Sequence, residues 1–173
     1  YPASIKNKKV VEFTNIDFKN LNSLEIDKLV KKNMKIGKSS YFLDIDELKK
    51  INPDYIITQD LCDVCAISEN QVITDLNNLS KKPKILSIGP KNIKEISESV
   101  IKIAKEFNMD KKGIEIVNNF NFEIKKISSI TKEIIDSPRV FCMEWINPFY
   151  SAGHWVPEMV EIAGGISGIT RPS

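Results

Sequence analysis

Residues 139–165, RVFCMEWINPFYSAGHWVPEMVEIAGG, contain both tryptophans of the chain, its only histidine and one of its three cysteines. The apolar run 139–145 leads into an Asn-Pro pair at 147–148, which is typical of a buried strand that ends in a turn. After residue 155 the apolar residues recur at helical spacing. Pro157 suits a first helical turn, and the Gly-Gly pair at 164–165 ends the helix. The stretch therefore predicts a strand, a loop and a helix.

A loop in this position favours a ligand site. In open α/β sheets, ligands bind at the carboxyl ends of the strands. Aromatic side chains with Asn and His beside them suit a broad, mostly apolar ligand that is held by a few polar contacts. The alternative is that Trp145 and Trp155 are core aromatics and that His154 is a structural hydrogen-bonding residue.

Composition indicates an ordinary soluble protein of 173 residues, 42% hydrophobic and 28% charged. The net charge is only +2, and two of the 25 basic residues are arginine, which argues against a nucleic-acid partner. No run of about 18 apolar residues is present, so no segment is expected to span a membrane. The chain begins with Tyr-Pro, and no amino-terminal signal is visible.

Strand and helix patterns alternate along the first two thirds of the chain, which favours an α/β fold with a parallel sheet. The predicted helices include one capped by Ser23 and one capped by Asp44. The predicted elements are strands at 9–14, 55–58 and 84–88, and helices at 23–34, 45–51, 68–79 and 92–107.

Residues 113–135 predict one long helix. Apolar residues recur there at intervals of three and four, and the helix would exceed twenty residues. We interpret this helix as a strut between two lobes, so that 1–112 belong to a first lobe and 136–173 begin a second. The alternative is a long surface helix that packs along one sheet. The apolar positions of this pattern are Ile114, Val117, Phe120, Ile124, Ile127, Ile130 and Ile134.

A second candidate for chemistry is the pair Cys62 and Cys65, which follows the predicted strand 55–58. A Cys-x-x-Cys pair in such a loop can form a disulfide, bind a metal or exchange thiols. A structural zinc needs four ligands, and only Cys142 and His154 remain as further donors. Cys142 is expected inside a strand, facing the core.

Two segments carry a resemblance to a known family. Residues 52–68, NPDYIITQDLCDVCAIS, and residues 139–165 resemble the cobalamin-binding-like periplasmic binding proteins, the substrate-binding components of ABC importers for cobalamin and iron siderophores. The resemblance implies a class III periplasmic binding protein-like fold: two α/β lobes with parallel sheets, joined by a long backbone helix, with the ligand between the lobes. In that comparison both ends of the fold are missing, so we expect a fragment.

The resemblance also implies which residues face the ligand, cobalamin or another corrinoid or metal chelate. An aromatic wall with scattered donors suits the broad apolar face and amide arms of a corrinoid. His154 would make a packing or amide contact, and an axial imidazole bond to the cobalt is the alternative. The implied ligand-binding residues are Gln59, Asp60, Leu61 and Cys62 on one wall and Trp145, Asn147, Pro148, Phe149, His154 and Trp155 on the other.

Partners and location follow from the same resemblance. An ABC permease would dock on Asp46 and Glu47, and the corrinoid would be a transported ligand rather than a cofactor. The full-length protein would be periplasmic or extracellular and membrane-anchored, with a cytoplasmic protein as the alternative. Exposed apolar surface at the ends of the fragment would allow a dimer.

No enzyme signature competes with this interpretation. The chain has no glycine-rich phosphate loop, and a single histidine limits general-base schemes. We expect Glu158 to stabilise the start of its own helix, where a carboxylate is favoured. Two alternatives to the binding protein stay open: a thiol or metal-dependent enzyme that uses Cys62 and Cys65, and a cytosolic corrinoid-binding module without a transporter.

Overall fold

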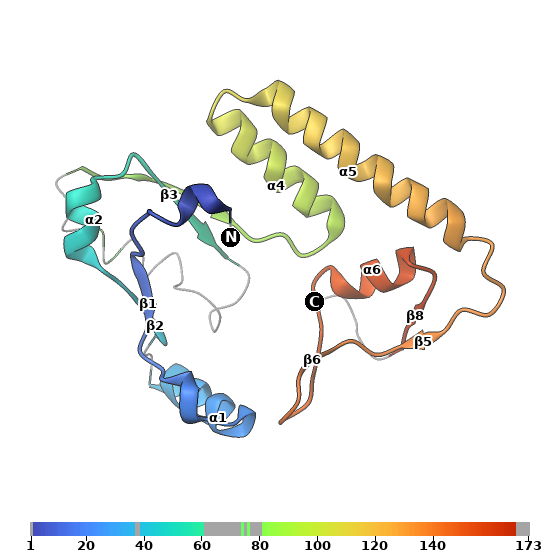
Figure 1. Cartoon of the computed structure of the whole chain (residues 1–173), viewed down its shortest axis with the longest axis horizontal. Helices are drawn as coiled ribbons and strands as arrows, with labels where there is room; N and C mark the ends of the chain where they lie inside the picture. The colour runs from blue at the N-terminus through green and yellow to red at the C-terminus, as the bar shows by residue number, and fades with distance from the viewer. Residues whose placement is uncertain (1, 37–38, 61–73, 75, 77–80, 169–173) are drawn as a thin grey trace. The chain divides into compact units, whose positions relative to one another are not determined.

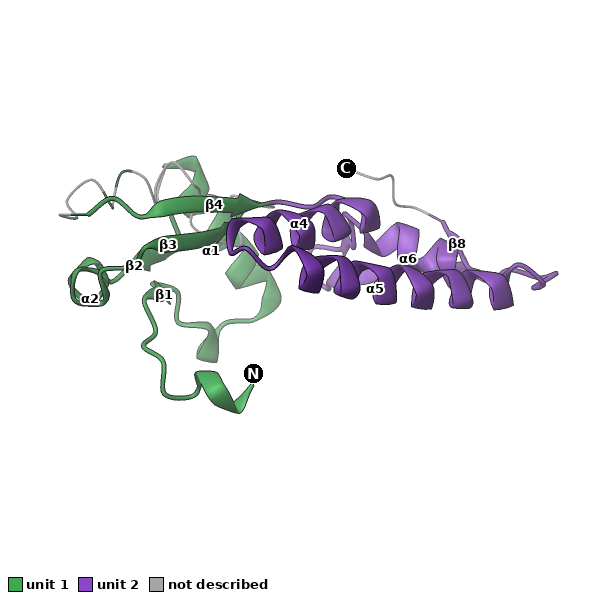
Figure 2. Cartoon of the chain, turned by 90° about the horizontal axis from the view of Figure 1, so that it is seen from above, with its two compact units in different colours: residues 1–88 green, residues 89–173 purple. Residues whose placement is uncertain are grey.

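The structure is a computed structural model that describes residues 2–36, 39–60, 74, 76 and 81–168 (Figure 1). Its backbone contacts divide the chain into two compact units, residues 1–88 and residues 89–173, which Figure 2 shows in green and purple. This boundary falls before residue 113, where the sequence predicted the end of the first lobe. The role of residues 113–135 as a link between lobes stays a prediction.

The first unit begins with a small antiparallel sheet. Strands β1 (Glu12–Thr14) and β2 (Tyr41–Leu43) pair so that Phe13 lies opposite Phe42. The short 3-10 helix η1 (Ala3–Ile5) precedes β1, while η2 (Phe18–Asn20) and α1 (Ser23–Lys35) lie between the two strands. The strand predicted at 9–14 is therefore confirmed only in its second half.

Helix α1 is capped by Asn22 and not by Ser23. The Asn22 side chain accepts hydrogen bonds from the backbone N–H groups of Leu24 and Glu25, and Glu25 Oε2 accepts from the Asn22 N–H at 2.8 Å. This reciprocal pair is a capping box. The prediction of Ser23 as the cap was wrong by one residue, because the carboxylate that completes the box stands three residues after Asn22.

The second sheet of the first unit is parallel. Strand β3 (Tyr55–Gln59) pairs in register with β4 (Lys84–Ile88), which confirms both predicted strands and adds Gln59 to the first. Helix α2 (Ile45–Ile51) precedes β3, and the Asp44 side chain caps it through the Glu47 N–H at 2.9 Å, as predicted. The helix predicted at 68–79 lies outside the described residues except for Thr74 and Leu76, which are helical.

The core of the first unit forms where α2 meets the two sheets. Leu48 of α2 and Leu76 are both buried. Tyr41 and Leu43 of β2, Ile56 of β3 and Ile85 of β4 pack against this pair, together with Val11 and Ile45. This small cluster packs against the amino-terminal halves of β3 and β4.

The second unit opens with a helical hairpin. Helices α4 (Ile93–Glu106) and α5 (Asp110–Thr131) lie side by side in both views (Figures 1 and 2). Asn108 in the connection has φ 55°, the left-handed conformation that commonly ends a helix. The two helices lie close together at Gly113, where an added Cβ would lie 2.4 Å from the Cβ of Ala104.

Helix α5 confirms the long helix predicted from the sequence, with 22 residues and both ends slightly earlier than expected. Only part of the apolar pattern is covered. Gly113 is buried and Val117, Phe120 and Ile124 are half-buried, whereas Ile114, Ile127 and Ile130 are exposed. The covered stripe includes Gly113 because α4 can approach closely only where α5 has no side chain. A search for apolar residues does not find this position, because glycine has no apolar side chain.

The rest of the second unit is built from two pairs of short strands. Strands β5 (Arg139–Val140) and β8 (Ile166–Ser167) are parallel, and α6 (Val156–Ile162) lies between them in the sequence. Strands β6 (Met143–Trp145) and β7 (Tyr150–Ser151) form an antiparallel hairpin. The prediction of one strand over 139–145 was therefore wrong, because the chain pairs with β8 first and then leaves to form the hairpin.

Helix α6 is fixed at its carboxyl end to the end of α5. The Thr131 hydroxyl donates a hydrogen bond to the Ile162 carbonyl at 2.8 Å. Gly164, with φ 84°, ends the helix as predicted, and an added Cβ there would lie 2.8 Å from Ile134 Cδ1. Within the described ranges, no helix is both long and apolar enough to cross a membrane.

Candidate functional site

The predicted ligand-binding residues fall in both units. Gln59 and Asp60 belong to the first unit, and the six residues from Trp145 to Trp155 belong to the second. Leu61 and Cys62 lie outside the described residues, and so does Cys65.

Gln59 and Asp60 lie at the carboxyl end of the parallel sheet. Gln59 is the last residue of β3 and pairs with Ile88, the last residue of β4. The Asp60 N–H donates to the Ile88 carbonyl at 2.9 Å, so the ladder continues one residue past the strand. Both side chains are exposed. The sheet therefore presents an amide and a carboxylate at the edge where α/β proteins bind ligands.

Four predicted residues lie in or beside the turn of the β6–β7 hairpin. Trp145 ends β6, and its indole N–H donates to the Asn147 carbonyl at 3.1 Å. Pro148 is half-buried, and Phe149 is exposed. The exposed Ile146 in the same turn was missed by the sequence analysis. The result is an apolar turn in which the polar atoms of Trp145 are already engaged.

His154 and Trp155 form a second group, immediately before α6. Their rings are 5.9 Å apart between centroids and are tilted by 52°. His154 has φ 53°, an uncommon conformation for a residue with a side chain. Both side chains are half-buried, and the Val156 N–H donates to the Gly153 carbonyl at 3.1 Å to close the turn. The strained backbone of His154 is therefore held by a turn and by the helix that follows.

Glu158 connects this turn to α4. Its Oε2 accepts a hydrogen bond at 2.8 Å from the backbone N–H of Ile93, which is 65 residues away and is the first residue of α4. Glu158 also lies in the first turn of its own helix, as predicted. The carboxylate thus lies at the amino-terminal ends of two helices, where a negative charge stabilises the helix ends. The bond to α4 was not predictable from local spacing.

Cys142 is not inside a strand, contrary to the prediction. It lies between β5 and β6, is half-buried as a free thiol, and its carbonyl accepts from the Ala152 N–H at 2.8 Å. Within the part of the chain that the structure describes, no three His, Cys, Asp or Glu side chains lie close enough to hold a metal ion.

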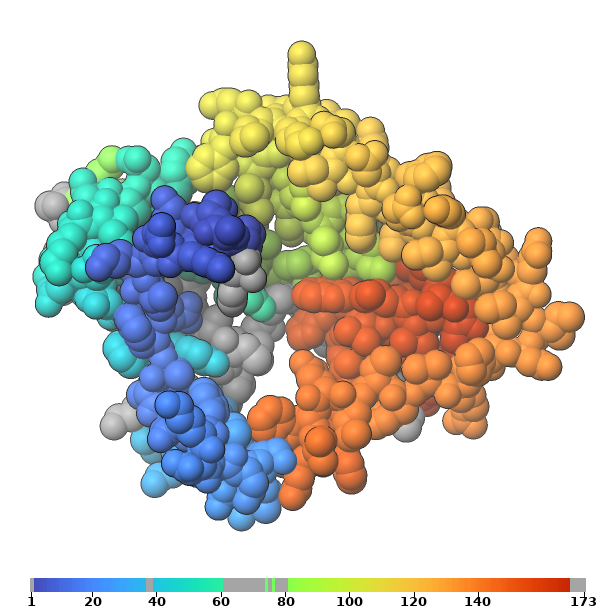
Figure 3. All heavy atoms as spheres, in the orientation of Figure 1, coloured from blue at the N-terminus to red at the C-terminus, as the bar shows by residue number. Residues whose placement is uncertain are grey.

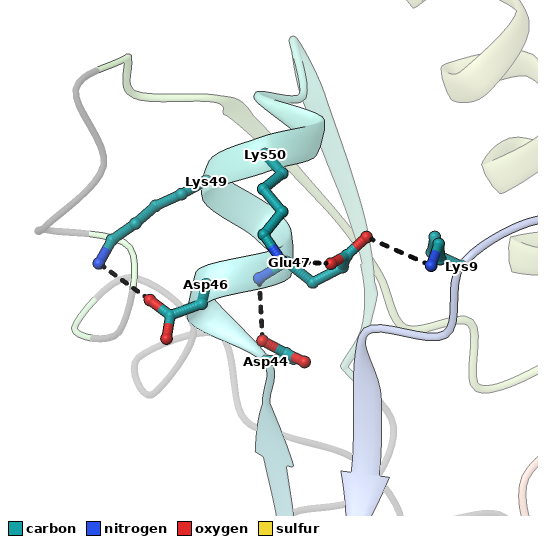
Figure 4. Close-up of polar contacts among 6 residues, drawn as sticks. All are labelled: Lys9, Asp44, Asp46, Glu47, Lys49 and Lys50. Atoms are coloured by element: carbon teal, nitrogen blue, oxygen red, sulfur yellow. Dashed lines mark hydrogen bonds and ion pairs between the residues drawn. The ribbon is translucent and has the colours of Figure 1, made fainter.

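The two acids predicted for permease docking differ in their surroundings (Figure 4). The Asp46 side chain points outward, is 85% exposed and lies 3.4 Å from Lys49 Nζ. The Glu47 side chain is only 19% exposed and lies between Lys50, at 3.1 Å, and Lys9, at 4.0 Å. The hydrogen bond from Lys50 to Glu47, together with the charge of that carboxylate, raises the pKa of Lys50. Asp46 is therefore the more accessible acid.

An open depression of about 720 Å³ lies beside Asp46 and was not predicted from the sequence. The stacked rings of Phe13 and Phe42 line it, with centroids 5.7 Å apart and planes tilted by 25°. Both phenylalanines are exposed. The sequence could have indicated this pair of rings, because Phe13 and Phe42 are the middle residues of two short strands, and residues that lie opposite each other in an antiparallel pair project from the same face.

No protein-family model and no curated protein sequence matches the chain. Solved structures do match it. A possible iron-binding, periplasmic solute-binding protein from Staphylococcus epidermidis has 22% identity and a TM-score of 0.60, over 72% of this chain and 48% of that one. The periplasmic heme-binding protein RhuT from Roseiflexus has 17% identity and a TM-score of 0.57, over 73% of this chain and 47% of that one.

The periplasmic vitamin B12-binding protein BtuF of Vibrio cholerae also matches, with 17% identity and a TM-score of 0.53, over 72% of this chain and 47% of that one. The chain thus spans about half the length of these proteins. At these identities the likeness is one of fold. The chain therefore has the α/β fold of the class III periplasmic solute-binding proteins, over roughly half of their length.

Proposed function

We propose that this chain is part of a substrate-binding protein that captures a metal chelate and delivers it to an ABC permease. The observation that carries the proposal is the fold likeness to proteins described as binding iron, heme and vitamin B12. The protein would bind its ligand without transforming it. The alternative enzyme built on Cys62 and Cys65 gains no support from the described residues.

The first choice of ligand is cobalamin or another corrinoid. The exposed Phe149 and the half-buried His154 and Trp155 supply aromatic surface of the kind that a flat macrocycle covers. Trp145, Asn147 and Pro148 would add to this wall. His154 would contact the cobalt or an amide arm. A porphyrin offers a similar apolar face, so heme is the nearest competing ligand.

The second wall of the proposed site is the carboxyl end of β3. Gln59 and Asp60 are exposed there, and Leu61 and Cys62 follow them in the sequence. An amide and a carboxylate would hydrogen-bond the polar arms of a corrinoid or siderophore. Helix α5 would serve as the link between the two walls.

Docking on the permease would use Asp46. This carboxylate is exposed and has one lysine near it, whereas Glu47 is held by two lysines. Asp46→Ala is expected to weaken binding to the reconstituted permease and to leave ligand affinity unchanged. Glu47→Ala is the matched variant, and it is expected to lower stability more than docking. Equal docking for Asp46→Ala and the unaltered chain would contradict this assignment.

The location and assembly of the whole protein belong to the same proposal. The protein would work in the periplasm or outside the cell, anchored to the membrane. Exposed apolar residues of α5, such as Ile114 and Ile130, would allow the isolated chain to dimerise.

The test is a titration of the full-length protein with cobalamin, cobinamide, hemin and a ferric siderophore. Visible absorbance and calorimetry would follow binding, and the 173-residue chain would be titrated in parallel. Tight binding of one corrinoid is the expected result. Tight binding of hemin or the siderophore alone would change the ligand and keep the transport role, and binding of none would contradict the proposal.

A further inference from the structure

Helix α1 carries four exposed lysines on one face. Lys28, Lys31, Lys32 and Lys35 line an open groove of about 410 Å³ together with Ile36; these four lysines are called the lysine face below. Their spacing of three and four residues places them on adjacent turns of one side of the helix. The atoms of α1 appear in blue at the lower edge of Figure 3.

The positive charge of the lysine face is weakly balanced within its own helix. Glu25, near the start of α1, is engaged by the Asn22 N–H in the capping box. The Asp27 side chain is only 9% exposed and pairs with Lys31 at 3.0 Å. Among the ion pairs of the described residues, none involves Lys28, Lys32 or Lys35. Three cationic side chains therefore project from one face without a carboxylate partner there.

Exposed apolar residues flank the lysine face on both sides. Met34 is 47% exposed and Ile36 is 59% exposed. At 3.6 residues per turn, Ile36 lies about 40° from Lys32 around the helix axis, and Met34 lies about 60° from Lys31. Lysines bordered by exposed apolar side chains are the pattern of helices that lie in a membrane interface, where cations meet headgroups and apolar residues enter the layer below.

The residue types favour a lipid surface over other anionic partners. Lysine is a compact point charge that suits a layer of mobile headgroups, whereas arginine is preferred where a phosphate must be bound in a fixed geometry. An acidic protein would satisfy the lysines but would leave Met34 and Ile36 facing a charged surface.

We propose that the lysine face of α1 docks on an anionic phospholipid bilayer, with Met34 and Ile36 entering the interfacial layer. This docking does not depend on which ligand the protein carries. Near an anionic membrane each lysine strengthens binding roughly fivefold, so the loss of three is expected to weaken it roughly a hundredfold. The attraction is electrostatic and falls with ionic strength.

The experiment is vesicle co-sedimentation of the 173-residue chain. Vesicles of phosphatidylglycerol mixed with phosphatidylcholine would be compared with vesicles of phosphatidylcholine alone, at low and high ionic strength. The chain is expected to sediment with the anionic vesicles at low ionic strength only. The triple variant Lys28→Gln, Lys32→Gln and Lys35→Gln is expected to stay in the supernatant.

Two variants distinguish binding through the lysine face from a general effect of net charge. A control that changes the exposed Lys111, Lys125 and Lys132 to Gln removes the same charge from elsewhere and is expected to bind normally. A variant that changes Lys28, Lys32 and Lys35 to Arg keeps the charge and is expected to retain binding. Lys, Gln and Arg have similar helix propensities, so α1 is expected to remain folded, which circular dichroism checks.

Equal loss in the control variant would overturn the proposal, since it would make the effect one of net charge. Failure of the unaltered chain to bind anionic vesicles would also overturn it. A competition experiment with polyglutamate gives a third test. If polyglutamate displaces the chain fully from the vesicles, and if Met34→Ser and Ile36→Ser leave its binding unchanged, the proposal is overturned, because the surface would then fit an acidic protein.

Discussion

Gly113→Ala tests a close contact between α4 and α5. A Cβ at residue 113 would lie 2.4 Å from the Cβ of Ala104. Nonbonded carbon atoms prefer separations of about 3.5–4.0 Å, so α4 and α5 would have to move apart by about 1 Å. Ala104 cannot move aside by rotation, because its side chain is a single methyl group. The added atom must therefore displace backbone.

Two effects of opposite sign set the size of the change. Alanine is favoured over glycine in a helix by about 1 kcal/mol, which would stabilise α5. Forcing one extra carbon into a closely packed contact costs about 1–3 kcal/mol, and an overlap of this size belongs in the upper part of that range. The expected result is a net loss of about 1–2 kcal/mol in the free energy of unfolding.

Urea unfolding followed by circular dichroism measures this free energy. The matched control is the exchange variant Ala104→Gly with Gly113→Ala, which moves the methyl group to the other helix and keeps the total helix propensity. Its stability is expected to be closer to that of the unaltered chain than the sum of the two single changes predicts. If Gly113→Ala alone proved more stable than the unaltered chain, helix propensity would outweigh packing and the close contact would be refuted.

Three further changes test a cap, an inter-helix bond and the ligand wall. Asn22→Ala should lower stability by about 1 kcal/mol in urea unfolding, and Ser23→Ala should lower it less, because Asn22 is the cap. A larger loss for Ser23→Ala would contradict this assignment. Glu158→Ala should lower the free energy of unfolding by about 1–2 kcal/mol and speed hydrogen exchange at the start of α4, and Glu158→Gln should recover part of this loss. Unchanged exchange would contradict the hydrogen bond between Glu158 and Ile93. Trp145→Ala and Trp155→Ala should each weaken ligand binding by about 1–3 kcal/mol in calorimetric titration, while unchanged affinity with lower stability would make these residues structural.

Local signals in the sequence explain most of the elements that were predicted well. Asp44 precedes a helical pattern and does cap α2, because the cap depends only on residues within one turn. The cap of α1 was also readable, since Glu25 stands three residues after Asn22 and completes the box. The hairpin strand Tyr150–Ser151 is too short to show an alternation, so the sequence could only indicate a loop there.

The sequence predicted which segments contain the candidate site residues, but it could not predict the exposure or the hydrogen-bond partners of their side chains. The strand pattern at 55–58 ended one residue before Gln59, and the pattern at 139–145 ended at Trp145, although the structure divides that stretch into β5 and β6. Whether Glu47 is exposed depends on Lys9, which belongs to a distant segment. The reach of Glu158 to Ile93 depends in the same way on how α4 lies beside α6.

Helix α6 has only seven residues and is bonded at both ends to the α4–α5 hairpin, through Glu158 at its start and Thr131 near its end. An isolated helix of that length does not persist in water, because the nucleation cost exceeds what so few hydrogen bonds return. The hairpin, in contrast, is built from contacts between neighbours in the sequence and can form early. It also leaves the ribosome first. We therefore expect an order of assembly in which α4 and α5 fold as a template and α6 forms upon it. The turn with His154 and Trp155 would then be among the last parts of the second unit to acquire its native conformation.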